Sequence, residues 1–321
     1  MISAAPTGFA GRDARLERVL GAAPRLALVA EADAHEGPVY AADEDALYFT
    51  SVPRRPAGGR PRVAIGRLQL DGARFPVGPG AIATVRPDAN AANGMAMDAE
   101  GRLIVCEQGS MEAPARIARM DRAGREVETL VRSCGGRRLS SPNDVVVASD
   151  GAVWFTDPSY GHLQGFRPPP EAGDAVYRHE PWSGRTEVVA DSLDKPNGLA
   201  LAPGERVLYV ADSGADQGGD GLRLDRPHGV VAFDVTGGAP ARGRPLATTP
   251  GAPDGIVADA EGRLYVCCAV GVQVLAPEGD VLGEIRLPGA VNLTFGGPEG
   301  TVLFITADTG IWAAVLAAKG A

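Results

Sequence analysis

One pattern recurs six times along the 321-residue chain, and it limits the possible folds more than any other feature of the sequence. Each copy has an apolar run, a tight turn that contains Gly or an acidic residue, and a second apolar run that ends in small or acidic residues. The six copies are AADEDALYFTSV (41–52), DAEGRLIVCEQG (98–109), ASDGAVWFTDP (148–158), APGERVLYVADSG (202–214), DAEGRLYVCCAVG (259–271) and GPEGTVLFITADTG (297–310). Repeats of roughly this length are typical of proteins built from successive copies of one supersecondary unit.

The segments between these copies have the pattern of β-hairpins. A Gly-containing turn lies between two short, roughly alternating runs in residues 115–131, 175–190, 229–247 and 272–287. Each repeat would then hold four strands, and four-stranded sheets repeated around an axis form a β-propeller. No segment beyond residue 22 sustains the period of a helix. The sequence therefore predicts an all-β fold, a six-bladed β-propeller with four-stranded blades and a central metal site.

The two ends of the chain have separate predictions. Residues 25–30 form an apolar run that would pair with residues 311–316 and close the ring of blades. Residues 11–20 have the composition of a short helix that lies outside the propeller. We therefore expect an N-terminal extension over residues 1–22 and a single propeller domain over residues 23–321.

Charge and composition exclude several classes of partner. The chain has 31 Lys and Arg against 40 Asp and Glu, and its net charge of −9 disfavours nucleic acid as a partner. It has no apolar run long enough to span a membrane, and its N-terminal segment lacks the apolar core of a signal peptide, which indicates a cytoplasmic protein. The four cysteines lack the spacing of a zinc cluster. We expect a monomer or a small homo-oligomer.

A side-chain oxygen recurs shortly before the turn of each repeat. The six residues at this position are Glu36, Asn93, Asn143, Asn197, Asp254 and Asn292. The innermost strands of a propeller run roughly parallel to its axis, so residues at one height converge on one point. Carboxylate and amide oxygens without His or Cys are the ligands of a hard cation. The sequence therefore predicts one divalent metal ion, with Ca²⁺ favoured because it accepts many protein oxygens. The alternatives are Mg²⁺, Mn²⁺ and Zn²⁺.

Several of the same strings resemble one known family. They are EGPV (36–39), SPNDVVVASDGAVWFTDPSYG (141–161), PNGLALAP (196–203), PDGIVADAEGRLYV (253–266) and NLTFGG (292–297). Together they are similar to the gluconolactonase and senescence-marker-protein (regucalcin-like) family, from about residue 14 to the end of the chain. The resemblance implies a six-bladed propeller, in agreement with the repeat count.

The resemblance also implies a site and an activity. The metal ligands of the family match Glu36, Asn143, Asn197 and Asp254 of this chain. The family implies a metal-dependent lactonase, which opens a sugar-derived lactone by attack of a metal-activated water on the ring ester. Asp254 is then the candidate catalytic base, and a metal-bound hydroxide is the alternative base. The expected partner is a small-molecule lactone.

Four further residues are candidates for binding the substrate. Asn93 and Asn292 occupy ring positions outside the implied ligand set, and Tyr160 and His162 begin a long loop that would line the mouth of the channel. Glu107, Asp157 and Asp212 each end the second run of a repeat, where a carboxylate is expected to cap a turn. Two other functions remain open at this point. One is hydrolysis of phosphotriesters or other esters on the same metal, and the other is a metal-binding propeller without catalytic activity.

Overall fold

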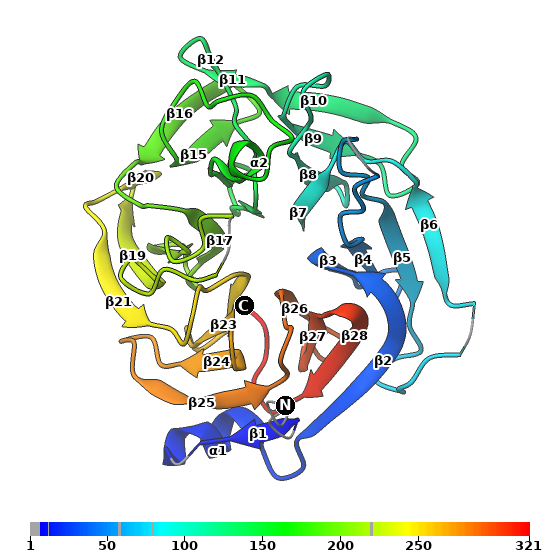
Figure 1. The fold of residues 1–321 in the computed structure, drawn as a ribbon. Coiled ribbons are helices and arrows are strands. Elements are labelled where there is room, and N and C mark those ends of the chain that lie inside the picture. The colour runs from blue at the N-terminus through cyan, green and yellow to red at the C-terminus, as the bar shows by residue number, and fades with distance from the viewer. Residues whose placement is uncertain (1–6, 12, 57–58, 79, 219–220) are drawn as a thin grey trace.

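Six antiparallel sheets surround a central axis in the computed structural model (Figure 1). The structure describes residues 7–11, 13–56, 59–78, 80–218 and 221–321. The first three blades consist of β3 (Glu36–Ala41), β4 (Ala46–Thr50), β5 (Ile65–Gln69) and β6 (Ile82–Arg86); β7 (Ala92–Met97), β8 (Leu103–Glu107), β9 (Arg116–Met120) and β10 (Val127–Val131); and β13 (Val145–Val147), β14 (Val153–Asp157), β15 (Ala175–Glu180) and β16 (Arg185–Ala190). The six-bladed propeller predicted from the repeats is confirmed.

The remaining blades follow the same order from the axis outward. They consist of β17 (Pro196–Leu201), β18 (Val207–Asp212), β19 (Gly229–Thr236) and β21 (Arg244–Thr248); β22 (Ile256–Ala258), β23 (Leu264–Cys268), β24 (Gly271–Leu275) and β25 (Val281–Arg286); and β26 (Asn292–Gly296), β27 (Val302–Thr306), β28 (Asp308–Val315) and β2 (Arg25–Ala34). Two short hairpin arms decorate the rim, formed by β11 (Ser133–Cys134) with β12 (Arg137–Arg138) and by β20 (Ala239–Pro240) against β19.

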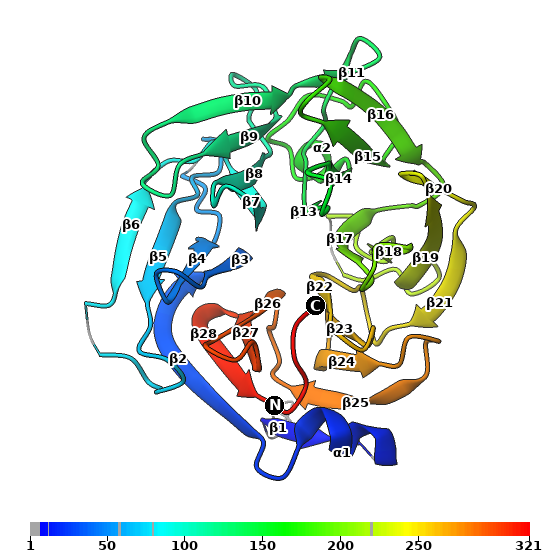
Figure 2. The same cartoon turned by 180° about the vertical axis from the view of Figure 1, so that it is seen from behind.

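The ring is closed by strands from the two ends of the chain. β2 pairs antiparallel with β28, and Arg25 lies opposite Val315 at one end of the ladder while Ala30 lies opposite Ile311 further along it. Figure 2 shows β2 running along the outer edge of the blade that the C-terminal strands form. The predicted pairing of residues 25–30 with residues 311–316 is therefore confirmed. The strands come from opposite ends of the sequence, so the last blade forms only when both ends are in place.

The segment before β2 contains the expected short helix and also a short strand. A short helix, α1 (Ala14–Leu20), lies where one is expected, and Asp13 caps its N-terminus by accepting a hydrogen bond from the backbone of Arg15 at 2.8 Å. Ahead of it, β1 (Gly8–Ala10) pairs with β25 and gives that blade a fifth strand. The sequence does not predict β1, because three residues are too few to show an alternating pattern.

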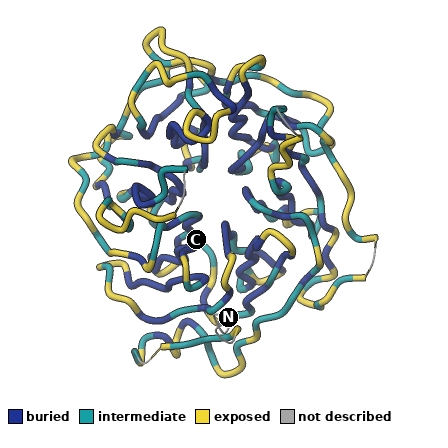
Figure 3. Tube along the Cα trace, in the orientation of Figure 1, coloured by how far each residue is buried: buried dark blue, intermediate teal, exposed yellow. Residues whose placement is uncertain are grey.

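The hydrophobic core lies between the blades. The second strand of a blade is covered on both faces by neighbouring blades, so β4, β8, β14, β23 and β27 are buried at every position (Figure 3). One such layer joins the first two blades and includes Tyr48, Leu103 and Val105. Burial on both faces explains why these strands read as continuous apolar runs rather than alternating ones.

The alternation of strand direction fixes which segments lie at each end of the axis. Each innermost strand starts at one face of the disk, which we call the ring face because Glu36 and Asn292 begin β3 and β26 there. The antiparallel order then places the loops between second and third strands on the ring face as well. The tight turns of the six repeats lie on the opposite face. No helix within the described residues is long and apolar enough to cross a membrane.

Candidate active site

The six predicted oxygen-bearing residues lie at or next to the starts of the innermost strands. Glu36, Asn93, Asn143, Asn197 and Asn292 are buried. Asp254 retains some accessible surface, although burial by protein atoms still raises the pKa of its carboxyl group. Backbone hydrogen bonds join neighbouring blades at this height, from Gly94 N to Asn143 O at 2.7 Å and from Gly255 N to Val291 O at 2.9 Å. The six residues therefore form one ring, which we call the oxygen ring.

The glycines that follow four ring residues are required by close packing between strands. A Cβ atom on Gly37 would lie 2.7 Å from the backbone nitrogen of Met95, and one on Gly198 would collide with the carbonyl oxygen of Asp254. Gly94 and Gly255 are equally close to the neighbouring strand. The Asn-Gly and Asp-Gly pairs are therefore contact points between innermost strands, and they allow the ring residues to converge.

Hydrogen bonds satisfy only part of the oxygen ring. The amide of Asn292 donates from Nδ2 to Oε2 of Glu36 at 2.6 Å, and the Asn197 side chain lies close enough to the Asp254 carboxyl group to oppose the rise in its pKa. In contrast, the Oδ1 atoms of Asn93 and Asn143 are buried and have no hydrogen-bond partner among the described residues. A buried acceptor without a partner is costly, and a cation bound beside such an oxygen would remove that cost.

The electrostatics of the oxygen ring also favour a cation. Burial raises the pKa of the Glu36 carboxyl well above its usual range, and repulsion from Asp254 and Asp144 raises it further. Burial raises the pKa of Asp254 to about 6, although the positive charge of His35 and the hydrogen bond from Asn197 oppose this shift. Two buried carboxyl groups that repel each other gain their charged forms most readily beside a positive ion.

The residues present fit a cation site of mixed ligands. Within the described part of the chain, no three His, Cys, Asp or Glu side chains converge as a metal-binding group. A cation would therefore depend on the asparagine oxygens as well as on Glu36 and Asp254. Asn143 provides an unpartnered, buried oxygen for this purpose. This donor set of carboxylate and amide oxygens suits a hard cation such as Ca²⁺.

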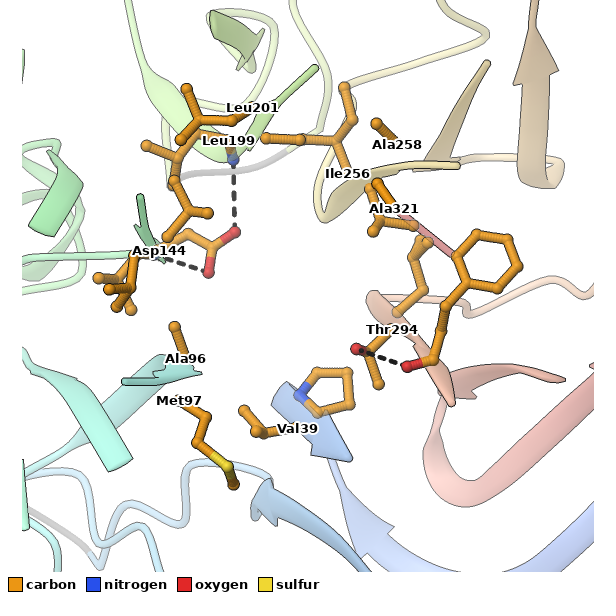
Figure 4. Close-up of a pocket in the computed structure, with 18 of the residues that line it drawn as sticks. Val39, Ala96, Met97, Asp144, Leu199, Leu201, Ile256, Ala258, Thr294 and Ala321 are labelled. Atoms are coloured by element: carbon orange, nitrogen blue, oxygen red, sulfur yellow. Dashed lines mark hydrogen bonds between the residues drawn. The ribbon is translucent and has the colours of Figure 1, made fainter. Parts of the chain in front are cut away.

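Asp144 is a channel residue that the sequence analysis did not identify. It lines a cavity of about 510 Å³, formed by the innermost strands of the six blades on the side of the ring away from the loops (Figure 4). Its carboxylate accepts hydrogen bonds from the backbone of Val145 at 2.9 Å and of Leu199 at 3.4 Å, and burial raises its pKa to about 7. The sequence did contain one signal for it. Gly directly follows four of the ring residues, Glu36, Asn93, Asn197 and Asp254, whereas Asp144 follows Asn143.

The two loop residues predicted to line the channel mouth differ in their positions. Both belong to α2 (Tyr160–Leu163), a single helical turn that follows β14. Tyr160 is buried, and its hydroxyl lies near Ser213 and Asn197 without a hydrogen-bond partner among the described residues. His162 is exposed. Tyr160 is thus the one that faces the oxygen ring.

His35, next to Glu36, has a polar partner. Its Nδ1 atom lies 2.7 Å from Oδ1 of Asp308, at the start of β28. The charge of His35 also lowers the pKa of Asp254, as described above. Because His35 is one of only four histidines and has no spacing motif, its proximity to Asp254 follows from the closure of the ring and was not visible in the sequence.

Carboxylates at the ends of second strands hold the loops that lead to the ring. Asp157 accepts hydrogen bonds from the backbone of Ser140 at 2.8 Å and Ser141 at 2.7 Å, just before Asn143. Asp212 does the same for Asp194 and Lys195, just before Asn197. Glu107 instead pairs with Arg86 and Arg116 and accepts from the Asn90 side chain. The predicted capping role is therefore confirmed for Asp157 and Asp212.

Threonines of three second strands join one blade to the next at the same height. Thr50 and Thr156 donate from their hydroxyl groups to the carbonyl oxygens of Asn93 at 3.2 Å and Asn197 at 2.8 Å. Thr306 donates to the carbonyl oxygen of His35 at 2.6 Å, across the junction that closes the propeller. The backbone of the oxygen ring is thus fixed from the neighbouring blade at several points.

These features define a class of protein, a six-bladed β-propeller with buried carboxylate and amide oxygens at its centre. Residues 34–309 match the SMP-30/gluconolactonase/LRE-like region model, which spans most of the chain. The chain therefore belongs to the SMP-30/gluconolactonase/LRE-like family.

Similar proteins of known name have lactones as their substrates. A gluconolactonase from Zymomonas mobilis is 32% identical over 235 residues, which cover 67% of this chain and 60% of the relative. The lactonohydrolase oryL of Aspergillus oryzae is 28% identical over 302 residues, which cover 86% of this chain and 66% of the relative. The chain thus spans about three fifths to two thirds of the length of these curated relatives.

Solved structures match over nearly the whole chain. A gluconolactonase from Xanthomonas campestris is 33% identical, covers 98% of both chains and superposes with a TM-score of 0.79. A calcium-binding regucalcin from Agrobacterium tumefaciens has 16% identity and a TM-score of 0.65, which shows a shared fold.

Proposed function

We propose that this protein is a metal-dependent lactonase that opens a sugar-derived lactone at the oxygen ring. The observation that carries the proposal is the convergence of Glu36 and Asp254 with unpartnered asparagine oxygens at the centre of the ring face. The similarity to the Xanthomonas campestris gluconolactonase over 98% of both chains supports a lactone as the substrate.

Four residues would hold the cation, which we infer to be Ca²⁺. They are Glu36, Asn143, Asn197 and Asp254, the ligand set that the family resemblance implies. When bound, a divalent cation supplies Lewis-acid chemistry, because it polarises an ester carbonyl and stabilises negative charge on its oxygen. It would also neutralise the repulsion that raises the pKa of Glu36.

Asp254 is the residue we assign as the base. Asp254 retains some accessible surface, so we propose that a water molecule can approach its carboxyl group. In the proposed reaction the water oxygen adds to the lactone carbonyl carbon while Asp254 takes up one of its protons. The ring C–O bond then breaks, and the proton passes to the departing ring oxygen, which leaves an open hydroxy acid. A bound cation would favour the charged form of Asp254, so its carboxylate would be available to accept a proton near neutral pH.

Two other side chains are placed to orient a polyhydroxylated substrate. The buried Oδ1 of Asn93 and the buried hydroxyl of Tyr160 are without partners among the described residues. We propose that hydroxyl groups of the lactone satisfy both atoms. Asn292 holds the Glu36 carboxylate through its 2.6 Å hydrogen bond, so we assign it a positioning role.

The test is hydrolysis of glucono-δ-lactone by chelator-treated protein, followed by acid release after Ca²⁺, Mg²⁺, Mn²⁺ or Zn²⁺ is added back. We expect one metal to restore activity in the wild type. Asp254→Asn should lose activity by about 10²–10⁴-fold if Asp254 is the base, while Ca²⁺ binding measured by calorimetry persists at reduced affinity. Glu299→Gln, an exposed carboxylate on the opposite face, is the control and should match the wild type.

Two results would contradict the proposal. Hydrolysis that survives in Asp254→Asn with bound metal would remove Asp254 from the role of base. A protein that binds metal and turns over neither the lactone nor a phosphotriester would be a metal-binding propeller without this activity.

A further inference from the structure

A second cavity, of about 660 Å³, lies on the ring face between the loops of the first three blades. It is separate from the channel cavity below the ring. Its walls come from residues 55, 56, 59, 60, 62, 110–112 and 165–166, which lie in loops that join second to third strands. We call it the arginine pocket, because Arg55, Arg60 and Arg62 line it. The volume lies within the range of pockets that bind small molecules.

The charges of the arginine pocket are unlike those of the whole molecule. Arg60 is neutralised by Asp88, with which it makes two hydrogen bonds. Arg55 is held by neutral groups, since it donates to the carbonyl oxygen of Gln164 at 2.6 Å and its guanidinium lies 5.5 Å from the centre of the Phe166 ring. Arg62 is exposed and makes no ion pair with the described residues. The one acidic side chain in the lining is Glu112. Three guanidinium groups therefore face the carboxylates of Asp88 and Glu112, which leaves one net positive charge at this pocket in a chain of net charge −9.

These side chains suit a small organic anion. A guanidinium group presents a planar set of donors that matches a carboxylate or a phosphate. The stacking of Arg55 on buried Phe166 fixes the plane of its donors before a ligand arrives. Met111 and Pro56 add apolar surface beside the charged groups, as in pockets that bind the carbon skeleton of a ligand together with its charge.

The wall of the arginine pocket is joined to the oxygen ring by buried hydrogen bonds. Arg167, in the loop between β14 and β15, donates to the carbonyl oxygens of Ser110 at 2.7 Å and Ser140 at 2.8 Å. It therefore joins the loop between β8 and β9 to the segment that leads to β13. The hydroxyl of Ser141 accepts from the backbone of Gly161 at 2.9 Å, within α2. The loop that leads to Asn143 and the turn that carries Tyr160 are thus fixed to the same wall.

We propose that the arginine pocket binds an anionic group, a phosphate or a carboxylate, through Arg55 and Arg62. The anion is either a substituent of the lactone substrate or a separate small anion. The first source rests on the proposed lactonase function, and the second does not. Binding and turnover therefore test different statements.

The binding arm uses inorganic phosphate and 6-phosphogluconate in calorimetry with the full chain. We expect wild-type protein to bind both, and we expect Arg55→Ala and Arg62→Ala each to weaken binding by about tenfold or more, as for other hydrogen bonds to charged groups. Arg55→Lys keeps the charge but loses the planar donors, so its affinity for either anion should lie between that of the wild type and that of Arg55→Ala. Arg54→Ala is the matched control, because Arg54 lies in the same loop and pairs with Asp33 at 2.6 Å.

The turnover arm compares glucono-δ-lactone with its 6-phosphate ester, which differ only in the phosphate. If the substrate carries the anion, Arg55→Ala and Arg62→Ala should lower kcat/KM for the phosphorylated lactone about tenfold and leave the neutral lactone unchanged. If both lactones are unaffected while phosphate binding is lost, a separate anion occupies the pocket. Failure of wild-type protein to bind either anion, or equal binding by the wild type and both alanine variants, would overturn the proposal. Absence of all lactone turnover would contradict the lactonase function alone.

Discussion

At the scale of single residues, the oxygen ring depends on glycines, whose lack of a Cβ atom lets the innermost strands approach each other, as well as on the ring residues themselves. Gly198 lies where the innermost strands of two blades approach, and a Cβ there would meet the Asp254 carbonyl oxygen and lie 3.0 Å from Ile256 N. These neighbours are backbone atoms, which a side-chain rotation cannot relieve. The convergence of the ring residues therefore requires glycine at four of the positions that follow them, as at Gly198.

Gly198→Ala is expected to destabilise the protein by about 1–3 kcal/mol, the usual cost of overpacking, and to lower the proposed lactonase activity by displacing Asp254. The measurements are the free energy of unfolding in denaturant and kcat/KM for glucono-δ-lactone. Gly173→Ala is the control, since a Cβ there meets no atom within 4 Å and the backbone does not require glycine. Equal stability of the two variants would show that the strands tolerate a wider separation.

At the scale of elements, two of the loops that precede ring residues are held by a carboxylate at the end of the adjacent second strand, Asp157 in one blade and Asp212 in the next. Asp157 at the end of β14 accepts two backbone hydrogen bonds from the loop before Asn143, and its pKa is raised to about 7 by burial. The loop has little regular structure of its own between β12 and β13. Its conformation therefore depends on this carboxylate.

Asp157→Ala leaves two backbone N–H groups without an acceptor, which costs about 1–3 kcal/mol for each group. We expect a lower midpoint of thermal unfolding together with weaker Ca²⁺ binding, because Asn143 follows the released loop. Asp121→Ala is the matched control. Asp121 accepts from the backbone of Arg125 at 2.7 Å and Glu126 at 3.1 Å, but in a turn on the opposite face. A loss of Ca²⁺ affinity in both variants, or in neither, would contradict a specific role for Asp157.

At the scale of the whole molecule, the sequence predicts the parts that repeat and misses the parts that occur once. Six copies of one pattern are enough to count the blades, and the match between residues 25–30 and 311–316 predicts their closure. The six side-chain oxygens were found for the same reason, because matched positions in a propeller converge. Asp144 and the arginine pocket depend on contacts between different blades, and β1 pairs far along the chain with β25. The arginine pocket and β1 leave no periodic signal, and Asp144 leaves only a departure from the Gly that follows four other ring residues.

The same convergence makes the stability of the whole molecule depend on pH and on the cation. Burial raises the pKa of Asp144 to about 7 and of Asp254 to about 6, while both titrate near 4 in the unfolded chain. Between these values the folded protein holds more protons than the unfolded chain, so its free energy of unfolding falls as the pH rises. A bound cation removes this penalty, because it stabilises the charged carboxylates, and its affinity rises as the protons leave.

We therefore expect the chelator-treated protein to unfold at a lower temperature at pH 8 than at pH 5, and Ca²⁺ to raise the unfolding temperature by several degrees more at pH 8 than at pH 5. Thermal unfolding followed by circular dichroism across this range, with and without Ca²⁺, measures both effects. Glu36→Gln removes one of the repelling carboxyl groups and should flatten both profiles, whereas Glu299→Gln should leave them unchanged because Glu299 is exposed on the opposite face. Parallel pH profiles in the presence and absence of Ca²⁺ would mean that the cation does not bind at the carboxyl groups of the channel.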